Sequence, residues 1–244
     1  MSQKSKIVFG IIGTMLAILT IVYIIIKMCF WGILSPNASA EQGAEILGGF
    51  NYLFYFTTIS NLMVAFWLLM WSYNNFFKKD KFKIVNNVYV QASITCYILV
   101  TMFVYWIFGV SLLGTTIMDN FLYVVINFHL HLIVPIFYIV LWFFPTSREE
   151  LDYAKTIKLL IYPLIYFIVV ELKGNLDGWY PYGFLDTRRI WSYVFKQEFS
   201  NIGAIFLLAG ACLVMSALIY AFGLLIFKIR NKQLEYKKRM GEIL

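Results

Sequence analysis

The sequence predicts an all-α membrane protein, a bundle of six transmembrane helices with both termini in the cytoplasm. Of its 244 residues, 61% are hydrophobic and only 14% are charged, whereas soluble domains average about 25% charged residues. Six segments are long and apolar enough to cross a bilayer, which takes roughly 20 apolar residues. Fifteen of the 20 Lys and Arg residues flank these segments on the side that holds both termini, and cytoplasmic loops carry such an excess.

The six predicted spans form a single domain that covers residues 1–244. We expect them at 7–27, 50–73, 88–113, 120–144, 157–172 and 201–227. The first segment is too long for a removable signal peptide and lacks a small-residue cleavage site, so we interpret it as a retained helix. The fifth segment is short and contains Pro163.

The largest predicted exterior element is the loop 173–200, which is rich in glycine, proline and aromatic residues. Its Trp179, Tyr180 and Tyr182 have the amphipathic rings that are favoured at a membrane interface. Loops placed over a rigid scaffold often carry function. We therefore expect a lid over the outer mouth of the bundle, with these rings at the substrate entry. An interfacial aromatic belt is the alternative.

Composition and cysteine spacing indicate which partners to expect. The net charge of +7 comes from basic residues at helix ends and in the tail 228–239, where anionic headgroups attract them. Cys29, Cys96 and Cys212 form no CxxC pair, so no disulfide framework or zinc site is indicated. We expect membrane lipids as partners, with no nucleic acid, metal or cofactor, and the oligomeric state stays open. The frequent Ile, Phe, Tyr, Asn and Lys suggest an AT-rich genome and a bacterial plasma membrane.

The two histidines of the chain, His129 and His131, both fall within the fourth predicted span. Ionisable residues inside a membrane are costly and are functional candidates by default. Because residues two apart on a helix lie about 200° apart, these two side chains face different neighbours. Asn120 and Asn127 continue the face of His131 as a polar seam. We favour His131 as the functional histidine and expect Asn127 to orient its ring. His129 is the alternative.

The second predicted span carries four polar residues within five positions: Thr57, Thr58, Ser60 and Asn61. At about 1.5 Å per residue, Thr58 is expected about 13 Å and His131 about 18 Å below the outer surface. A neutral imidazole suits the role of a base that activates a threonine hydroxyl. Asn61 is then placed to donate to a developing oxyanion. The alternative is structural, since Ser and Thr in membrane helices commonly bond their own or a neighbouring helix.

The segments "FTTISN", "FHLHLIVP" and "GWYPYGFLD" resemble the androgen-induced / androgen-dependent TFPI-regulating protein family, especially its bacterial relatives. Animal members of this six-span family are threonine hydrolases that cleave fatty acid esters of hydroxy fatty acids. The resemblance implies an integral membrane lipid ester hydrolase with Thr58 as nucleophile and His131 as general base. Thr57 and His129 are the neighbouring alternatives. A non-enzymatic lipid-binding or transport protein and a structural membrane subunit are the alternative functions.

Overall fold

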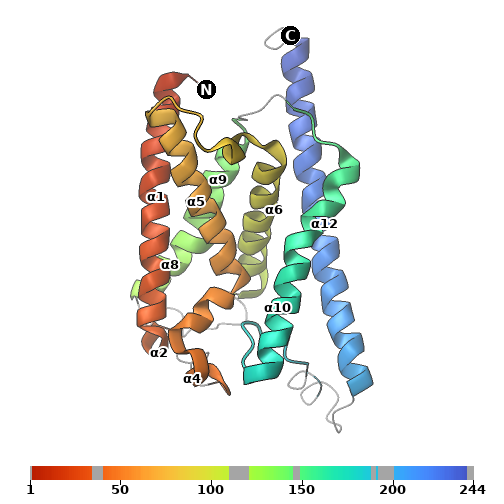
Figure 1. Ribbon diagram of the computed structural model, residues 1–244. Helices are drawn as coiled ribbons and strands as arrows, with labels where there is room; N and C mark the ends of the chain where they lie inside the picture. Colours follow the sequence, from red (N-terminus) through yellow and green to blue (C-terminus); the bar gives the residue numbers. More distant parts are fainter. Residues whose placement is uncertain are drawn as a thin grey trace.

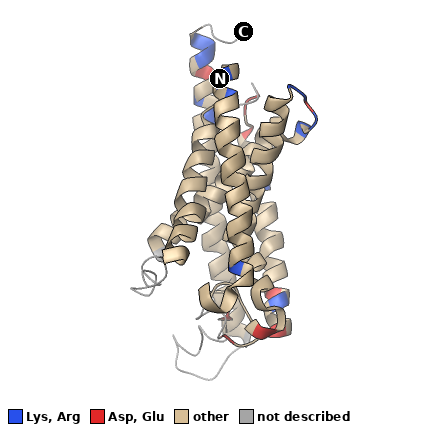
Figure 2. Cartoon of the chain, turned by 90° about the vertical axis from the view of Figure 1, so that its left-hand side faces the viewer, with Lys and Arg blue, Asp and Glu red and all other residues tan. Residues whose placement is uncertain are grey.

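The computed structural model describes residues 2–34, 41–109, 121–144, 149–187, 191 and 201–240, and the regular elements in these ranges are all helical. Five helices are long and apolar enough to cross a membrane, namely Gln3–Cys29, Phe56–Phe76, Val88–Ile107, Phe121–Trp142 and Ile202–Arg239. The predicted all-α membrane protein is confirmed at this level. Both termini lie at one end of the bundle, here called the terminal end (Figure 1). Lys and Arg residues gather at this end (Figure 2).

The first four predicted spans correspond to helices that pack on one another. They are α1 (Gln3–Cys29), α5 (Phe56–Phe76), α6 (Val88–Val104) with its π-helical extension η3 (Tyr105–Gly109), and a composite helix. The composite helix consists of α8 (Phe121–Phe128), the π-helix η5 (His129–Ile133) and α9 (Val134–Trp142). The predicted third span runs to residue 113, and its last residues lie outside the described ranges.

The fifth predicted span packs on the sixth through its first residues. A 3-10 helix, η6 (Tyr153–Leu160), leads into α10 (Ile161–Asp177), which has 17 residues and is shorter than the five candidate spans. A sixth membrane crossing along η6 and α10 therefore stays a prediction. The final helix, α12 (Asn201–Arg239), extends beyond the predicted end at residue 227, so the basic tail is helical.

The second helix begins later than predicted. A 3-10 helix, η1 (Gly48–Phe54), precedes α5, which starts at Phe56 rather than near residue 50. Tyr55, with φ of −74° and ψ of 133°, has an extended backbone and separates η1 from α5. Thr58 consequently lies in the first turn of α5, and its depth below the membrane surface stays a prediction.

Short elements cover the end of the bundle opposite the termini. They are α2 (Trp31–Leu34), α4 (Ala44–Leu47), η1 and the segment that follows α10 (Figure 1). We call residues 41–55 and 178–187 the cap. Trp179 of the cap is fully buried and lies edge-on to Trp31 at 6.0 Å and to Tyr55 at 5.8 Å. The predicted loop thus starts at Gly178, since 173–177 belong to α10, and most of 188–200 lies outside the described residues.

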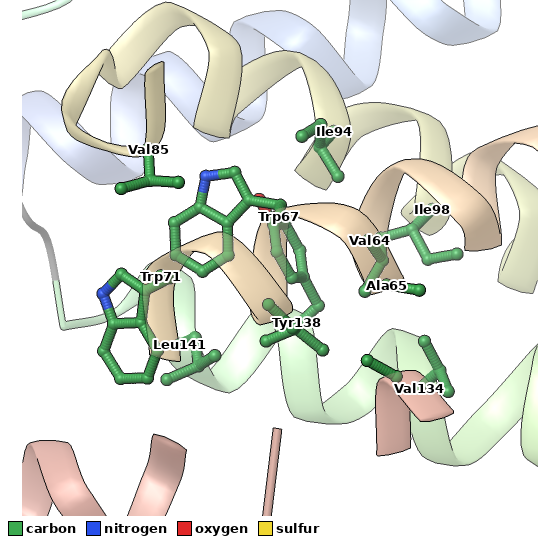
Figure 3. Close-up of a cluster of buried hydrophobic side chains, with 12 residues drawn as sticks. Val64, Ala65, Trp67, Trp71, Val85, Ile94, Ile98, Val134, Tyr138 and Leu141 are labelled. Atoms are coloured by element: carbon green, nitrogen blue, oxygen red, sulfur yellow. The ribbon is translucent and has the colours of Figure 1, made fainter. Parts of the chain in front are cut away.

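A cluster of large apolar side chains fixes α5 against α6 and α9 (Figure 3). The indole rings of Trp67 and Trp71 stack at 5.9 Å, and Tyr138 meets Trp67 edge-on at 5.2 Å. All three residues are buried. Such aromatic pairs contribute about 0.5–1.5 kcal/mol each beyond the area they bury. This cluster holds the half of α5 that faces the terminal end and leaves its first turn to the cap.

Substituting Gly43 by alanine should loosen the cap. Gly43 has a φ of 76°, and an added Cβ would lie 1.9 Å from the Asp177 carbonyl oxygen. We expect the free energy of unfolding to fall by about 1–3 kcal/mol, as for other overpacked sites. Thermal unfolding in detergent measures the change. Gly32→Ala is the matched control, because no atom lies within 4 Å of the added Cβ there; equal loss in both variants would contradict the prediction.

Candidate functional site

The ring of His131 is held from two sides. Its Nδ1 lies 2.9 Å from the Asn127 carbonyl oxygen, which can only accept, so Nδ1 carries the proton. The ring also stacks on Tyr105 with centroids 3.6 Å apart. In the neutral ring, Nε2 therefore carries the lone pair, a tautomer that we infer from this hydrogen bond. Asn127 orients the ring, as expected, but through its backbone rather than its side chain.

His129 contacts a different helix. Its Nε2 lies 2.9 Å from Thr20 Oγ1 of α1, and the Thr20 hydroxyl donates to the Leu16 carbonyl at 2.8 Å. Thr20 therefore accepts from His129, and Tyr23 meets the imidazole edge-on at 4.9 Å. The two histidines face different neighbours, as their separation along the helix predicts. In this arrangement His129 links η5 to α1.

Pro135 accounts for the surroundings of His131. Proline has no N–H, so an interior proline leaves carbonyl groups of the preceding turn without their helical donor. Asn61 Nδ2 of α5 donates to the Leu130 carbonyl at 3.1 Å, and Trp106 Nε1 of η3 donates to the His131 carbonyl at 3.0 Å. In an apolar environment such side-chain donors replace the missing backbone bond. Sequence reasoning missed this, although the proline was visible.

Most of the polar groups in "FTTISN" have structural hydrogen bonds. Asn61 Nδ2 donates both to the Thr57 carbonyl at 2.9 Å and to Leu130, so its amide has no proton left for an oxyanion. The Ser60 hydroxyl lies 3.0 Å from the Thr57 carbonyl and 2.8 Å from the Thr101 hydroxyl of α6. These bonds tie α5 to α6 and to η5. The structural interpretation fits these residues.

Thr58 differs from this pattern. Its residue is 0% exposed, and its hydroxyl oxygen has no hydrogen-bond partner in the described part of the protein. The hydroxyls of Thr14, Thr20 and Thr95, by contrast, donate to a carbonyl four residues earlier at 2.7–2.8 Å. The Tyr52 hydroxyl faces Thr58 without reaching hydrogen-bond geometry. No hydrogen bond joins Thr58 to His131 in the described residues.

The first turn of α5 supplies backbone donors beside Thr58. The first four N–H groups of a helix lack intrahelical partners, and the N-cap residue Tyr55 forms no side-chain cap. The Thr57 N–H instead donates to the Tyr182 hydroxyl of the cap in a long bond of 3.4 Å. Burial raises the pKa of Tyr182, so this hydroxyl stays protonated at neutral pH. The cap thus completes the helix terminus next to the candidate nucleophile.

Lys27 is a site residue that the sequence does not indicate, because it stands at the end of the first predicted span, where flanking charges are common. It is 4% exposed, and its Nζ donates to Asn127 Oδ1 at 3.2 Å. The ammonium lies 5.1 Å from the Tyr52 ring centroid and 4.5 Å from that of Tyr123. We call this set the polar cluster; it comprises Lys27, Tyr52, Thr58, Asn127 and His131.

The remaining features do not add to the cluster. The Tyr180 ring packs where a Cβ on Gly174 would lie, at 2.2 Å. A hollow of about 650 Å³ opens elsewhere, at the terminal end, lined in part by Glu150, Lys228 and Lys232. It contains none of the predicted site residues. No group of three His, Cys, Asp or Glu side chains in the described ranges is arranged to hold a metal ion.

Removing either donor to the proline-freed carbonyls should destabilise the fold. We expect Asn61→Leu and Trp106→Phe each to cost about 1–3 kcal/mol, because a buried carbonyl loses its hydrogen bond. Pro135→Ala restores one backbone N–H, so it should reduce the cost of one of these substitutions. A double-mutant cycle on unfolding in detergent measures this coupling. Additive costs in both cycles would contradict the explanation by Pro135.

Comparison with known proteins gives no match: no protein-family model, curated protein or solved structure matches the chain. The resemblance of "FTTISN", "FHLHLIVP" and "GWYPYGFLD" to the androgen-induced family therefore stays a prediction. The function has to be argued from the polar cluster itself.

Proposed function

We propose that this protein is an integral membrane hydrolase of lipid esters, with Thr58 as its nucleophile. The observation that carries the proposal is the buried Thr58 hydroxyl without a hydrogen-bond partner among the described residues. An unsatisfied buried hydroxyl costs about 1–3 kcal/mol, so its retention needs a reason other than stability. A substrate carbonyl that reacts with this hydroxyl supplies that reason.

His131 acts as the base in this proposal. Its Nδ1 is committed to the Asn127 carbonyl, which leaves the Nε2 lone pair to accept a proton. Thr58 Oγ attacks the ester carbonyl carbon while its proton moves to Nε2, directly or through one water. The protonated ring then gives this proton to the departing alcohol. Water cleaves the acyl-threonine, restores the hydroxyl and releases the fatty acid.

The developing negative charge needs donors beside Thr58. Asn61 was expected in this role, but its amide protons are both used. We assign the role to the Tyr52 hydroxyl, which faces Thr58, together with the N-terminal N–H groups of α5. Helix N-termini and fixed hydroxyl donors stabilise oxyanions in this way, and one such donor is worth about 10²–10³ in rate.

The proposal includes a topology. The terminal end faces the cytoplasm, α10 with η6 makes the sixth crossing, and the cap lies on the outer side of the membrane. The basic residues at the terminal end support this orientation. Thr58 then lies under the cap, near the outer leaflet. Lipid esters, including fatty acid esters of hydroxy fatty acids, approach sideways from that leaflet beneath Tyr182 in a bacterial plasma membrane.

A non-enzymatic lipid-binding or transport protein is the second candidate. It is favoured by one observation, namely that no hydrogen bond joins Thr58 to His131 among the described residues. In this function the polar cluster holds a headgroup without reacting. It predicts bound lipid but no turnover and no covalent labelling.

Hydrolysis should depend on Thr58 and His131. We expect the purified protein to cleave a branched fatty acid ester, and Thr58→Ala or His131→Ala to lower kcat/KM by at least about 10³-fold. A fluorophosphonate probe should label Thr58, which peptide mass spectrometry identifies. Tyr52→Phe should lower kcat by about 10²-fold through loss of one donor to the oxyanion.

Two matched controls separate chemistry from folding. Thr156 is also fully buried with an unpartnered hydroxyl, but it lies in η6. His129 lies on the same π-helix as His131 but bonds Thr20. Thr156→Ala and His129→Gln should keep activity. Full activity in Thr58→Ala and His131→Ala would rule out the hydrolase, and bound lipid without turnover would favour the second candidate.

A further inference from the structure

Lys27 and Lys173 are two buried lysines in closely similar surroundings. Lys27 is 4% exposed and Lys173 is 8% exposed, and each ammonium lies over two aromatic rings at about 4–5 Å. They differ in one respect. Lys173 forms a 2.8 Å ion pair with Asp177, whereas no carboxylate in the described part of the chain pairs with Lys27.

The partners of Lys27 do not neutralise an ammonium ion. Asn127 Oδ1 is a neutral acceptor at 3.2 Å, and the two tyrosine rings supply only their quadrupoles. Lys27 also lies in the last turn of α1, where a helix offers roughly half a negative elementary charge. Buried charges are usually paired. The protein partners of Lys27 therefore balance its positive charge only in part.

The ammonium lies close to both the surface and the candidate nucleophile. Tyr123, whose ring centroid is 4.5 Å from Nζ, is itself only partly buried, so one side chain separates Nζ from the outside of the bundle. On the inner side, Nζ lies 5.1 Å from the ring centroid of Tyr52, and Tyr52 faces Thr58. A group bound at Lys27 would thus lie one side chain away from Thr58.

We propose that Lys27 is an anion-binding site for the charged oxygen group, a carboxylate or a phosphate, of an amphiphilic lipid. The Lys27 ammonium forms an ion pair with this lipid oxygen group, as the Lys173 ammonium does with Asp177. The Tyr52 and Tyr123 rings cover the Lys27 ammonium. Assigning this lipid to the substrate rests on the proposed function, whereas the anion site itself does not. The protein then selects esters that carry a second, negatively charged group over neutral esters.

Competition binding with single-chain probes tests this site without any turnover. The displacement of radiolabelled dodecanoate is measured with dodecanoate, dodecyl phosphate and methyl dodecanoate, on wild-type protein and Thr58→Ala in neutral detergent. We expect a charged competitor to bind at least about tenfold more tightly than the methyl ester. Whichever of dodecanoate and dodecyl phosphate binds more tightly identifies the preferred oxygen group.

Lysine variants test whether Lys27 causes the preference for charged probes over the methyl ester. Lys27→Met, which keeps the length of the side chain, should reduce the charge preference to within about twofold, and Lys27→Arg should keep most of it. Lys173→Met is the matched control and should leave it unchanged. Equal binding of charged and methyl ester probes by the wild type, or a preference that survives in Lys27→Met, would overturn the anion site. Binding with this preference but without ester turnover would keep the site and overturn the hydrolase.

Discussion

The missing N–H of Pro135 is the constraint on which the centre of this bundle depends. Two carbonyl groups in the turn before it receive side-chain donors from other helices, Asn61 from α5 and Trp106 from η3. In water these carbonyls would be solvated, but inside a membrane protein they need protein partners. One residue in the fourth helix thus fixes its neighbours on both sides. The π-helical turn that carries both histidines lies directly before it.

This constraint also positions the candidate base. Trp106 bonds the backbone of His131 itself, and the adjacent Tyr105 stacks on the imidazole ring. The donor to the His131 carbonyl and the ring that stacks on its imidazole therefore both come from the π-helical extension of α6. The Nδ1 bond to Asn127 then sets the tautomer. A rigid backbone and a ring with a defined tautomer are what a general base requires.

Much of the fold could be predicted from sequence, because long apolar segments have few alternatives to helices in a membrane. The start of α5 could not. Residues 50–55 are as apolar and aromatic as the helix that follows, and the break between η1 and α5 is the extended backbone of Tyr55. Hydropathy carries no information about such a break. The π-helices could not be predicted for the same reason, since they do not alter the composition of a segment.

The part of the candidate site that depends only on helical geometry, namely the different directions of the two histidine side chains, could be predicted from the sequence. The two-residue spacing separated His129 from His131, and the structure gives them different neighbours. The partners themselves were not predictable. Lys27 lies at the end of the first span, where a lysine usually reaches the interface, and only tertiary packing turns it toward Asn127. Tyr52 was one of many aromatic residues and gained its significance from facing Thr58.

The buried polar groups divide by whether the fold satisfies them. Asn61 and Trp106 donate to carbonyl groups of other helices, and the Ser60 hydroxyl bonds the Thr101 hydroxyl of α6, so the occurrence of these residues follows from stability. The Thr58 hydroxyl and the positive charge of Lys27 are not satisfied in this way, although each is buried. Stability favours replacing such groups with apolar ones of similar shape. They lie one side chain apart, on either side of Tyr52, and our proposals assign both to a single ligand with a carbonyl and an anionic group.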